Sequence, residues 1–186
     1  AGKVSIIAAV GCSAFALLAF ISMYEIRVPQ VSADDVQTSV NVLNTPPDWT
    51  VVAQERVESS ATNPTNIGTS TIWHATATDS SGDPYFLLIC KSSSTPTAIA
   101  NAPPRCNGGL GNRWAISATT TSGTEATAAT TTVETITFAQ ENNDWVAWIC
   151  DSNSSLPRCN ATYEIGSSNF ASPFVVNHPP VFSLIV

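Results

Sequence analysis

The stretch STIWHATAT, residues 70–78, alternates strictly between two sets of side chains. One set comprises Trp73, Ala75 and Ala77, and the other comprises Ile72, His74, Thr76 and Thr78. Successive side chains of a β-strand point to opposite faces of the sheet, so this alternation predicts a half-buried strand. We expect Trp73 on the face that packs into the core.

Several segments on both sides of this stretch also have the composition of strands, because β-branched and aromatic residues are bounded by Gly, Pro, Asn and Ser. They are DWTVVAQE (48–55), YFLLIC (85–90), RWAISATT (113–120), TTVETITFA (131–139) and WVAWIC (145–150). YFLLIC and WVAWIC are apolar on both faces, which predicts central strands. Strands recur too often for βαβ units, so we expect an antiparallel β-sandwich head of immunoglobulin-like or cadherin-like type over residues 46–186.

Two cysteine-containing segments resemble each other. ICKSSS…PPRCN spans 89–107 and ICDSNSSLPRCN spans 149–160. Four cysteines allow three pairings, and the repeated form favours Cys90 with Cys106 and Cys150 with Cys159. Such bridges indicate an oxidising compartment. We interpret Cys12, the fifth cysteine, as a small hydrophobic residue.

Residues 5–24, SIIAAVGCSAFALLAFISMY, contain no charged side chain. About twenty predominantly apolar residues at 1.5 Å rise per residue are long enough to cross a bilayer as a helix. We therefore predict a long hydrophobic helix over residues 1–28, ended by Pro29, and a linker over 29–45 that includes a short alternating stretch. The predicted fold class is α+β: one long N-terminal helix followed by an all-β immunoglobulin-like sandwich.

Three interpretations of the apolar stretch compete: a cleaved secretory signal, a membrane anchor, and a segment that packs against other copies of itself. Small residues recur at spacings of three and four, which would form a stripe on one face of a helix and let backbones approach closely. The stripe comprises Ser5, Ala9, Cys12, Ala16 and Ala19. Ala and Gly are also frequent in ordinary membrane helices. Packing between copies is the sharper hypothesis.

An apolar helix at the start of the chain, followed by a linker and a disulfide-containing, Ser/Thr-rich β head, resembles the type IV pilin superfamily. In that family a peptidase removes a short leader, the helices bundle into a filament core, and the heads form its outside. Ala1 and Ser5 depart from the bacterial pattern of Phe and Glu, whereas archaeal-type pilins generally lack that Glu. The resemblance implies a filament built from copies of this chain, inserted in the membrane before assembly.

The rest of the chain is acidic and rich in Ser and Thr. Residues 29–186 contain five basic and thirteen acidic residues, a formal charge of −8. This charge disfavours nucleic acid and anionic lipid as partners. Asn153 and Asn160 lie in N-glycosylation sequons, and the composition suits an extracellular or cell-surface protein.

The turn DSSGD, residues 79–83, resembles the calcium-binding turns of cadherin-like repeats. That resemblance implies a calcium site at Asp79 and Asp83, to which Glu55 and Asp151 could add oxygens. A glycine-containing hairpin turn capped by aspartates explains the same residues without a metal. No other cofactor is expected.

The sequence contains no catalytic signature. His74 lies in a predicted strand and His178 between Asn177 and Pro179, and we interpret both as structural. Phosphate-binding glycine loops, Cys-x-x-Cys and His-Glu-x-x-His are absent from the sequence. We therefore expect no enzyme.

The motif Asn-x-Pro-Pro occurs in VLNTPPDWTVV (42–52) and again in VVNHPPVFSLIV (175–186). This repetition resembles the junctions of tandem extracellular modules. The final segment is predicted to add a strand either to its own sheet or to a neighbouring subunit.

These observations together predict a structural subunit of an extracellular helical filament, which could serve adhesion. The alternative is a membrane-anchored adhesion or binding module whose loops recognise a glycan or another surface ligand.

Overall fold

The computed structural model describes residues 43–91, 94–131 and 141–178. In these ranges the chain forms eleven strands and two single 3-10 turns. The strands are β1 (Asp48–Glu55), β2 (Thr65–Asn66), β3 (Ser70–Thr78), β4 (Tyr85–Lys91), β5 (Pro96–Ile99), β6 (Ala102–Cys106), β7 (Arg113–Ile116), β8 (Glu125–Thr131), β9 (Asn142–Asn143), β10 (Trp145–Asp151) and β11 (Phe174–Asn177). The 3-10 turns are η1 (Leu110–Asn112) and η2 (Ser168–Phe170).

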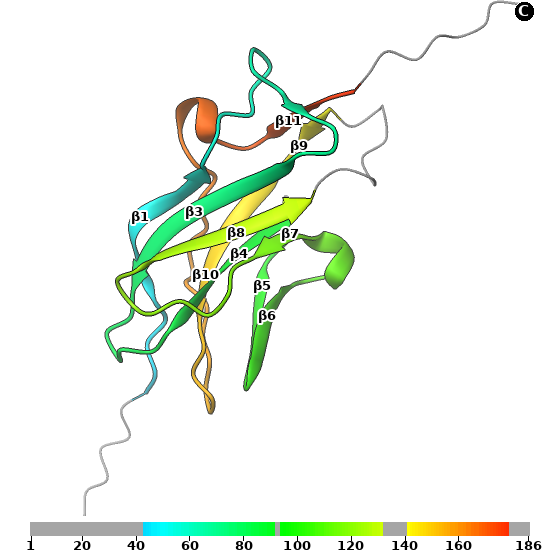
Figure 1. The fold of residues 1–186 in the computed structure, drawn as a ribbon. Helices are drawn as coiled ribbons and strands as arrows, with labels where there is room; N and C mark the ends of the chain where they lie inside the picture. Colours follow the sequence, from blue (N-terminus) through cyan, green and yellow to red (C-terminus); the bar gives the residue numbers. More distant parts are fainter. Residues whose placement is uncertain (1–42, 92–93, 132–140, 179–186) are drawn as a thin grey trace, which may run out of the picture. The chain divides into compact units, whose positions relative to one another are not determined.

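Two antiparallel three-stranded sheets form the body of the fold (Figure 1). One has the order β1-β3-β8 and the other the order β10-β4-β7. Their inner faces share one hydrophobic core, to which β1, β3 and β8 contribute from one side and β4, β7 and β10 from the other. A small third sheet joins β2, β11 and β9, and β5 and β6 form a separate hairpin. The expected β-sandwich arrangement of two facing sheets is therefore present.

The alternation in β3 places its side chains as predicted. Trp73, Ala75 and Ala77 are fully buried, and the intervening residues are partly exposed. Trp73 makes edge-to-face contacts with Trp145 and Phe174, with ring centroids 6.0 and 5.7 Å apart. Such aromatic pairs add to the free energy of burial, so this cluster joins strands from both sheets at the centre of the core.

The outer face of β4 and β10 is also buried. Leu88, Cys90, Val146 and Trp148 form a second hydrophobic cluster there with Cys106 of the β5–β6 hairpin. The Cys90–Cys106 disulfide links the hairpin covalently to β4. Because one face meets the opposite sheet and the other meets the hairpin, both strands need apolar residues at successive positions.

The prediction that both apolar strands are central holds for β4 and is wrong for β10. β4 lies between β10 and β7, whereas β10 is at an edge of its sheet. The free side of β10 pairs instead with the segment that follows it, through bridges from Ala147 to Glu164 and from Cys150 to Cys159. The second expected disulfide, Cys150–Cys159, closes this return of the chain.

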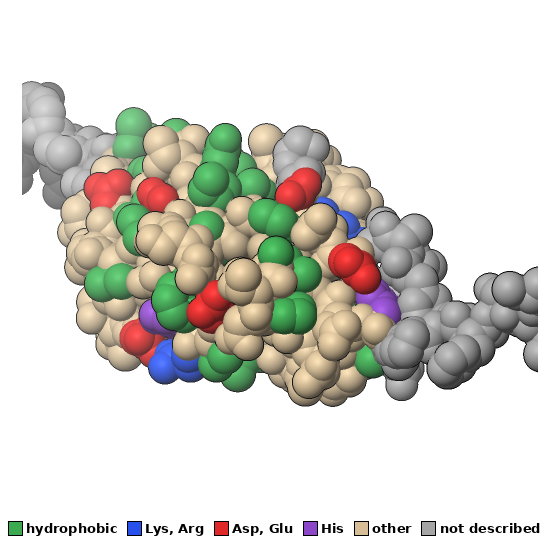
Figure 2. Space-filling model, turned by 90° about the horizontal axis from the view of Figure 1, so that it is seen from above, with side chains coloured by type: hydrophobic (Ala, Val, Ile, Leu, Met, Phe, Trp, Pro, Cys, Tyr) green, Lys and Arg blue, Asp and Glu red, His purple; other side chains and the backbone are tan. Residues whose placement is uncertain are grey.

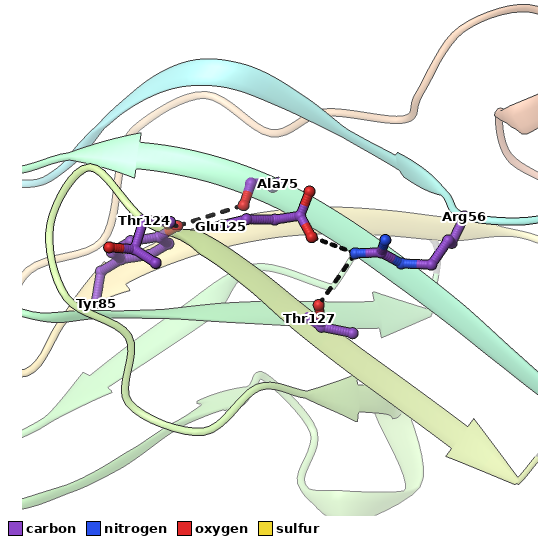
Figure 3. A network of polar contacts seen from close by, with 6 residues as sticks. All are labelled: Arg56, Ala75, Tyr85, Thr124, Glu125 and Thr127. Atoms are coloured by element: carbon purple, nitrogen blue, oxygen red, sulfur yellow. Dashed lines mark hydrogen bonds and ion pairs between the residues drawn. The ribbon is translucent and has the colours of Figure 1, made fainter.

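Polar contacts connect strands across the first sheet and across the core (Figure 3). The guanidinium of Arg56, just after β1, contacts Glu125 and Thr127 of β8. The three side chains lie on the exposed face of the first sheet. Their contact crosses β3, the strand between β1 and β8. Tyr85, at the start of β4, crosses the core to the first sheet.

Several strands were not expected. β8, with the sequence EATAATT, ends at Thr131, the first residue of the predicted segment 131–139; the rest of that segment lies outside the described residues. Ala126 and Ala128 are buried against the core, where their small side chains leave room for Trp73, the ladder partner of Ala128. β6 contains Pro103 and Pro104 and pairs only with β5, in agreement with the confinement of proline to edge strands.

The prediction of an α+β class is wrong. The described residues form a mostly β fold without an α-helix, since both hydrophobic clusters are closed by sheets and a hairpin. In the same ranges no helix has the length and apolar character needed to span a bilayer. The expected helix over 1–28, most of the linker over 29–45 and the apolar segment 180–186 lie outside the described residues.

Candidate functional site

The turn between β3 and β4 holds Asp79 and Asp83. The N–H of Gly82 donates to the carbonyl of Asp79 at 3.0 Å, and the N–H of Ser81 donates to Asp79 Oδ1 at 2.7 Å. Gly82 has a φ of +77°, a conformation that side-chain-bearing residues rarely adopt. Asp79 thus has the turn-capping role that its sequence context allows.

The loop after β10 approaches this turn. Asp151 Oδ1 accepts from the N–H of Asn153, and Asp151 Oδ2 accepts from the N–H of Arg158. The side-chain amide of Asn153 donates to Asp83 Oδ2 at 2.9 Å. The Cys150–Cys159 disulfide closes the same loop, so the bridge and the hydrogen bonds together fix its shape.

Asn44 joins the start of the described chain to this cluster. Its side-chain amide donates to Asp151 Oδ2 at 2.7 Å and to the carbonyl of Leu156 at 2.9 Å. Thr45 Oγ1 lies 2.5 Å from Ser80 Oγ in the β3–β4 turn. The segment that leads into β1 is therefore held by both loops. We call Asn44, Asp79, Asp83, Asp151 and Asn153 the acidic end of the head.

The acidic end contains uncompensated polar atoms. Burial raises the pKa of the Asp151 carboxyl above its ordinary value, and the charge of Asp79 adds to the rise. Hydrogen bonds from Asn153, Asn44 and Arg158 act in the opposite direction. Asp79 Oδ2 and Asn44 Oδ1 are buried without a hydrogen-bond partner among the described residues. Two carboxyl groups thus lie close together where solvent screens them poorly.

The calcium site at Asp79 and Asp83 stays a prediction. Calcium takes six to eight oxygen ligands. Within the described ranges, no three or more His, Cys, Asp or Glu residues are arranged to hold a metal ion. Asp83 is hydrogen-bonded to Asn153, and Glu55 lies in the core beside Trp145, at the opposite end of β10 from Asp151. The turn-capping interpretation accounts for the contacts that the structure shows.

Both asparagines of the N-glycosylation sequons donate hydrogen bonds from their side-chain amides. Asn160 is buried, and its Nδ2 donates to the carbonyl of Pro47 at 2.8 Å and to Asp48 Oδ1 at 3.2 Å. Asn153 is half-buried and donates to Asp83. Glycan attachment at either nitrogen would replace these contacts.

The remaining predicted residues divide into two groups. His74 lies on the outer face of β3, and His178 is buried beyond β11. Neither is part of a cluster of ionisable side chains that could hold a metal in the described part of the chain. The assembly residues Ser5, Ala9, Cys12, Ala16 and Ala19 lie outside the described residues.

An open groove of about 510 Å³ lies over β10, beside the start of the β5–β6 hairpin. Trp148, Tyr163 and Ile165 supply its apolar walls, and Ser94, Asp144 and Ser172 supply polar groups. Trp148 and Tyr163 contact each other edge to face, at 5.6 Å between centroids. The groove was not predicted from the sequence, because it forms only where the 163–172 segment lies beside β10. The aromatic residue Tyr163 was the one signal that the sequence offered.

The face of the molecule drawn in Figure 2 carries few charges. On the face drawn, side chains that are neither charged nor hydrophobic, together with backbone, cover most of the area. Acidic side chains appear at several separate places, and hydrophobic ones form small patches. Arg56 and Glu125 form the one ion pair found in the described part of the chain. Uncharged side chains and backbone thus dominate this face.

Comparison of the chain with protein-family models, with curated proteins and with solved structures gives no match.

Proposed function

We propose that the chain is a structural subunit of an extracellular filament, in which residues 5–24 of neighbouring copies pack together and the β heads face water. One observation carries this proposal. The described residues build both hydrophobic clusters from their own side chains, while residues 5–24 form twenty uncharged positions in the same chain. Burying such a segment yields about 25 cal/mol per Å² of apolar surface, so it has a strong tendency to associate.

The two disulfides support an extracellular location. Cys90–Cys106 and Cys150–Cys159 indicate that the head forms in an oxidising compartment. They lie at different places, one under the β5–β6 hairpin and one after β10. A head stabilised in this way suits the outside of a filament, where it would be exposed to proteases and to changing solvent conditions.

Sedimentation after shearing tests the proposal. Filament material sheared from cells should pellet as a polymer, with the full chain as its subunit, and negative-stain microscopy should show rods. A chain that stays in the membrane fraction and becomes monomeric in detergent would instead be an anchored adhesion module. That outcome would contradict the proposal.

Charge substitutions in the apolar segment and in the head test which part of the chain assembly depends on. Ala16→Asp places a carboxylate in the apolar segment and should abolish sedimentable material, because burying an unpaired charge costs several kcal/mol. Ala129→Asp, at an exposed position of β8, is the matched control and should leave assembly intact. Disulfide formation in both variants, measured by the mobility shift on reduction, would show that the head still folds.

A further inference from the structure

Glu55 is a carboxyl group inside the main hydrophobic core. It is the last residue of β1, and its exposed fraction is 1%. Ala53, two residues earlier, is on the same inner face, and Trp73 is the ladder partner of Glu55 on β3. Buried Glu is rare unless a partner compensates its charge.

The hydrogen bonds of Glu55 are incomplete. The indole N–H of Trp145 on β10 donates to Glu55 Oε1 at 3.0 Å. Glu55 Oε2 is buried and has no partner among the described residues, and the same is true of the indole nitrogen of Trp73. The bond to Trp145 joins β1 to a strand of the opposite sheet, so it ties the two sheets together.

No cation in the described part of the chain compensates Glu55. Arg56 follows it, but its guanidinium contacts Glu125 on the exposed face. His74 points to the outer face of β3, and the Tyr85 hydroxyl contacts backbone carbonyls. On the facing sheet, Lys91 is the ladder partner of Trp145, and its Nζ lies over the ring of Trp114, 4.7 Å from the centroid. Asp144 is exposed, and His178 follows β11. Burial raises the pKa of Glu55 to about 8, and the bond from Trp145 opposes the rise without reversing it.

β1 is an edge strand with few buried side chains. It lies at an edge of its sheet and pairs with β3 alone. Its pairing has register irregularities between Trp49 and Val51 and between Val51 and Gln54. Val51 and Val52 are exposed, so Ala53 and Glu55 are the fully buried residues of the strand.

We propose that Glu55 is a proton-controlled latch, which holds β1 against the opposite sheet while its carboxyl is protonated and releases it in mildly alkaline solution. A neutral carboxyl keeps Oε1 as an acceptor for Trp145 and places no charge in the core. An ionised carboxyl would be a buried charge with one hydrogen bond, and hydration of that charge requires β1 to separate from β10.

The direction of the pH dependence follows from linkage. The ordinary pKa of the carboxyl, 4.5, applies in the unfolded chain, and burial raises the pKa to about 8 in the folded head. Between these values the folded head retains a proton that the unfolded chain has lost, so stability is greatest below the lower value and falls as pH rises. The folding equilibrium constant should fall by at most about tenfold per pH unit and level off above about pH 8.

Glu55→Gln tests the latch, because glutamine keeps the Oε1 acceptor and cannot ionise. Urea unfolding of the full chain is measured from pH 5 to 9 for the wild type, for Glu55→Gln and for the exposed control Glu141→Gln. We expect the wild type and Glu141→Gln to lose stability in parallel, and Glu55→Gln to lose much less. Equal pH slopes for all three proteins would overturn the proposal.

Hydrogen exchange locates the response. Protection factors of the β1 amides should fall at pH 9 in the wild type, while those of β4 stay high. A uniform loss over both strands would contradict release of β1. If Glu55→Gln does not fold, the wild type labelled with ¹³C at its glutamate carboxyls still decides the question: one carboxyl should titrate near pH 8, and titration of all of them below about pH 6 would exclude the latch.

Discussion

The side-chain hydroxyl of Tyr85, at the start of β4, donates a hydrogen bond to the carbonyl of Thr124, which directly precedes β8 in the facing sheet (Figure 3). The same oxygen accepts from the N–H of Ala77 at 3.2 Å. Tyr85 is fully buried, and burial raises the pKa of its phenol. One side chain thus satisfies two backbone groups across the core, just beyond the end of the β3–β8 ladder.

Replacing Tyr85 by Phe should therefore destabilise the head. The ring still fills its place, but the carbonyl of Thr124 and the N–H of Ala77 lose their partner. An unsatisfied buried polar group costs about 1–3 kcal/mol, and we expect a loss of that size in the free energy of unfolding by urea. A change below about 0.5 kcal/mol would show that water replaces the hydroxyl.

The ion pair between Arg56 and Glu125 is also drawn in Figure 3. Its contribution to stability should differ from that of the Tyr85 hydroxyl. Both side chains are nearly half exposed, so solvent and salt screen their attraction. Glu125→Gln should cost no more than about 1 kcal/mol, and the difference should shrink in high salt. Urea unfolding at two salt concentrations measures this and serves as a control for Tyr85→Phe.

The two disulfides should contribute unequally. Each is expected to stabilise by about 2–4 kcal/mol, and the longer loop constrains the unfolded chain more. Cys90 and Cys106 are 16 residues apart, whereas Cys150 and Cys159 are 9 apart. The double variant Cys90→Ala/Cys106→Ala should therefore have the lower melting temperature in calorimetry.

Tryptophan fluorescence tests whether the Cys90–Cys106 bridge also keeps the β5–β6 hairpin over Trp148. Loss of the Cys90–Cys106 bridge frees the hairpin over Trp148, so acrylamide should quench tryptophan fluorescence more in that variant. Removal of Cys150 and Cys159 should change quenching less. The reverse order would mean that the hairpin stays in place through its apolar contacts alone.

Removing one charge from the acidic end should stabilise the head. Asp79→Asn keeps the Oδ1 acceptor for Ser81 and removes a charge that adds to the rise that burial causes in the pKa of Asp151. We expect a gain of about 0.5–1 kcal/mol in urea unfolding at neutral pH, with Asp144→Asn as the exposed control. Because a raised carboxyl pKa costs stability as pH rises, the gain should disappear in acid, below the ordinary pKa of aspartate.

The effect of calcium on stability gives a second test of the Asp79→Asn variant. If the acidic end bound calcium, the wild type would gain stability when calcium replaced a chelator, and Asp79→Asn would not. Such a result would contradict the turn-capping interpretation of Asp79. Thermal unfolding with calcium and with EDTA distinguishes the two.

Asn160 should be structurally essential and free of glycan in the folded protein. Its Nδ2 is hydrogen-bonded to Pro47 and Asp48, and its Oδ1 accepts from the N–H and hydroxyl of Thr162. Asn160→Ala should cost about 1–3 kcal/mol in unfolding free energy. Peptide mass spectrometry of native material tests the second part, and a fully occupied site at Asn160 would refute it.

Local patterns predicted the strands whose residues alternate or are apolar throughout. β1 and β3 have the predicted bounds, and the repeated Cys segments indicated both disulfides. β8 was missed, because an Ala- and Thr-rich strand gains its stability from packing beneath Trp73 rather than from its own propensity.

Contacts between distant residues could not be predicted in this way. In the sequence DWTVVAQE, Glu55 is recognisable only as a polar residue. Its hydrogen-bond partner Trp145 is 90 residues away. Asn44 and Asp151 are 107 residues apart. The sequence grouped Asp79, Asp83 and Asp151 only through a resemblance. The contact of Asn44 with Asp151 and the burial of Glu55 became visible when the fold brought distant residues together.

β1 begins near one end of the sandwich and β11 finishes near the other (Figure 1). A pulling force applied through the chain at these two points would run roughly along the strands. In that direction the β1–β3 ladder is loaded in shear, so its hydrogen bonds must rupture together instead of unzipping one after another. The head should consequently resist mechanical tension better than its equilibrium stability alone would indicate.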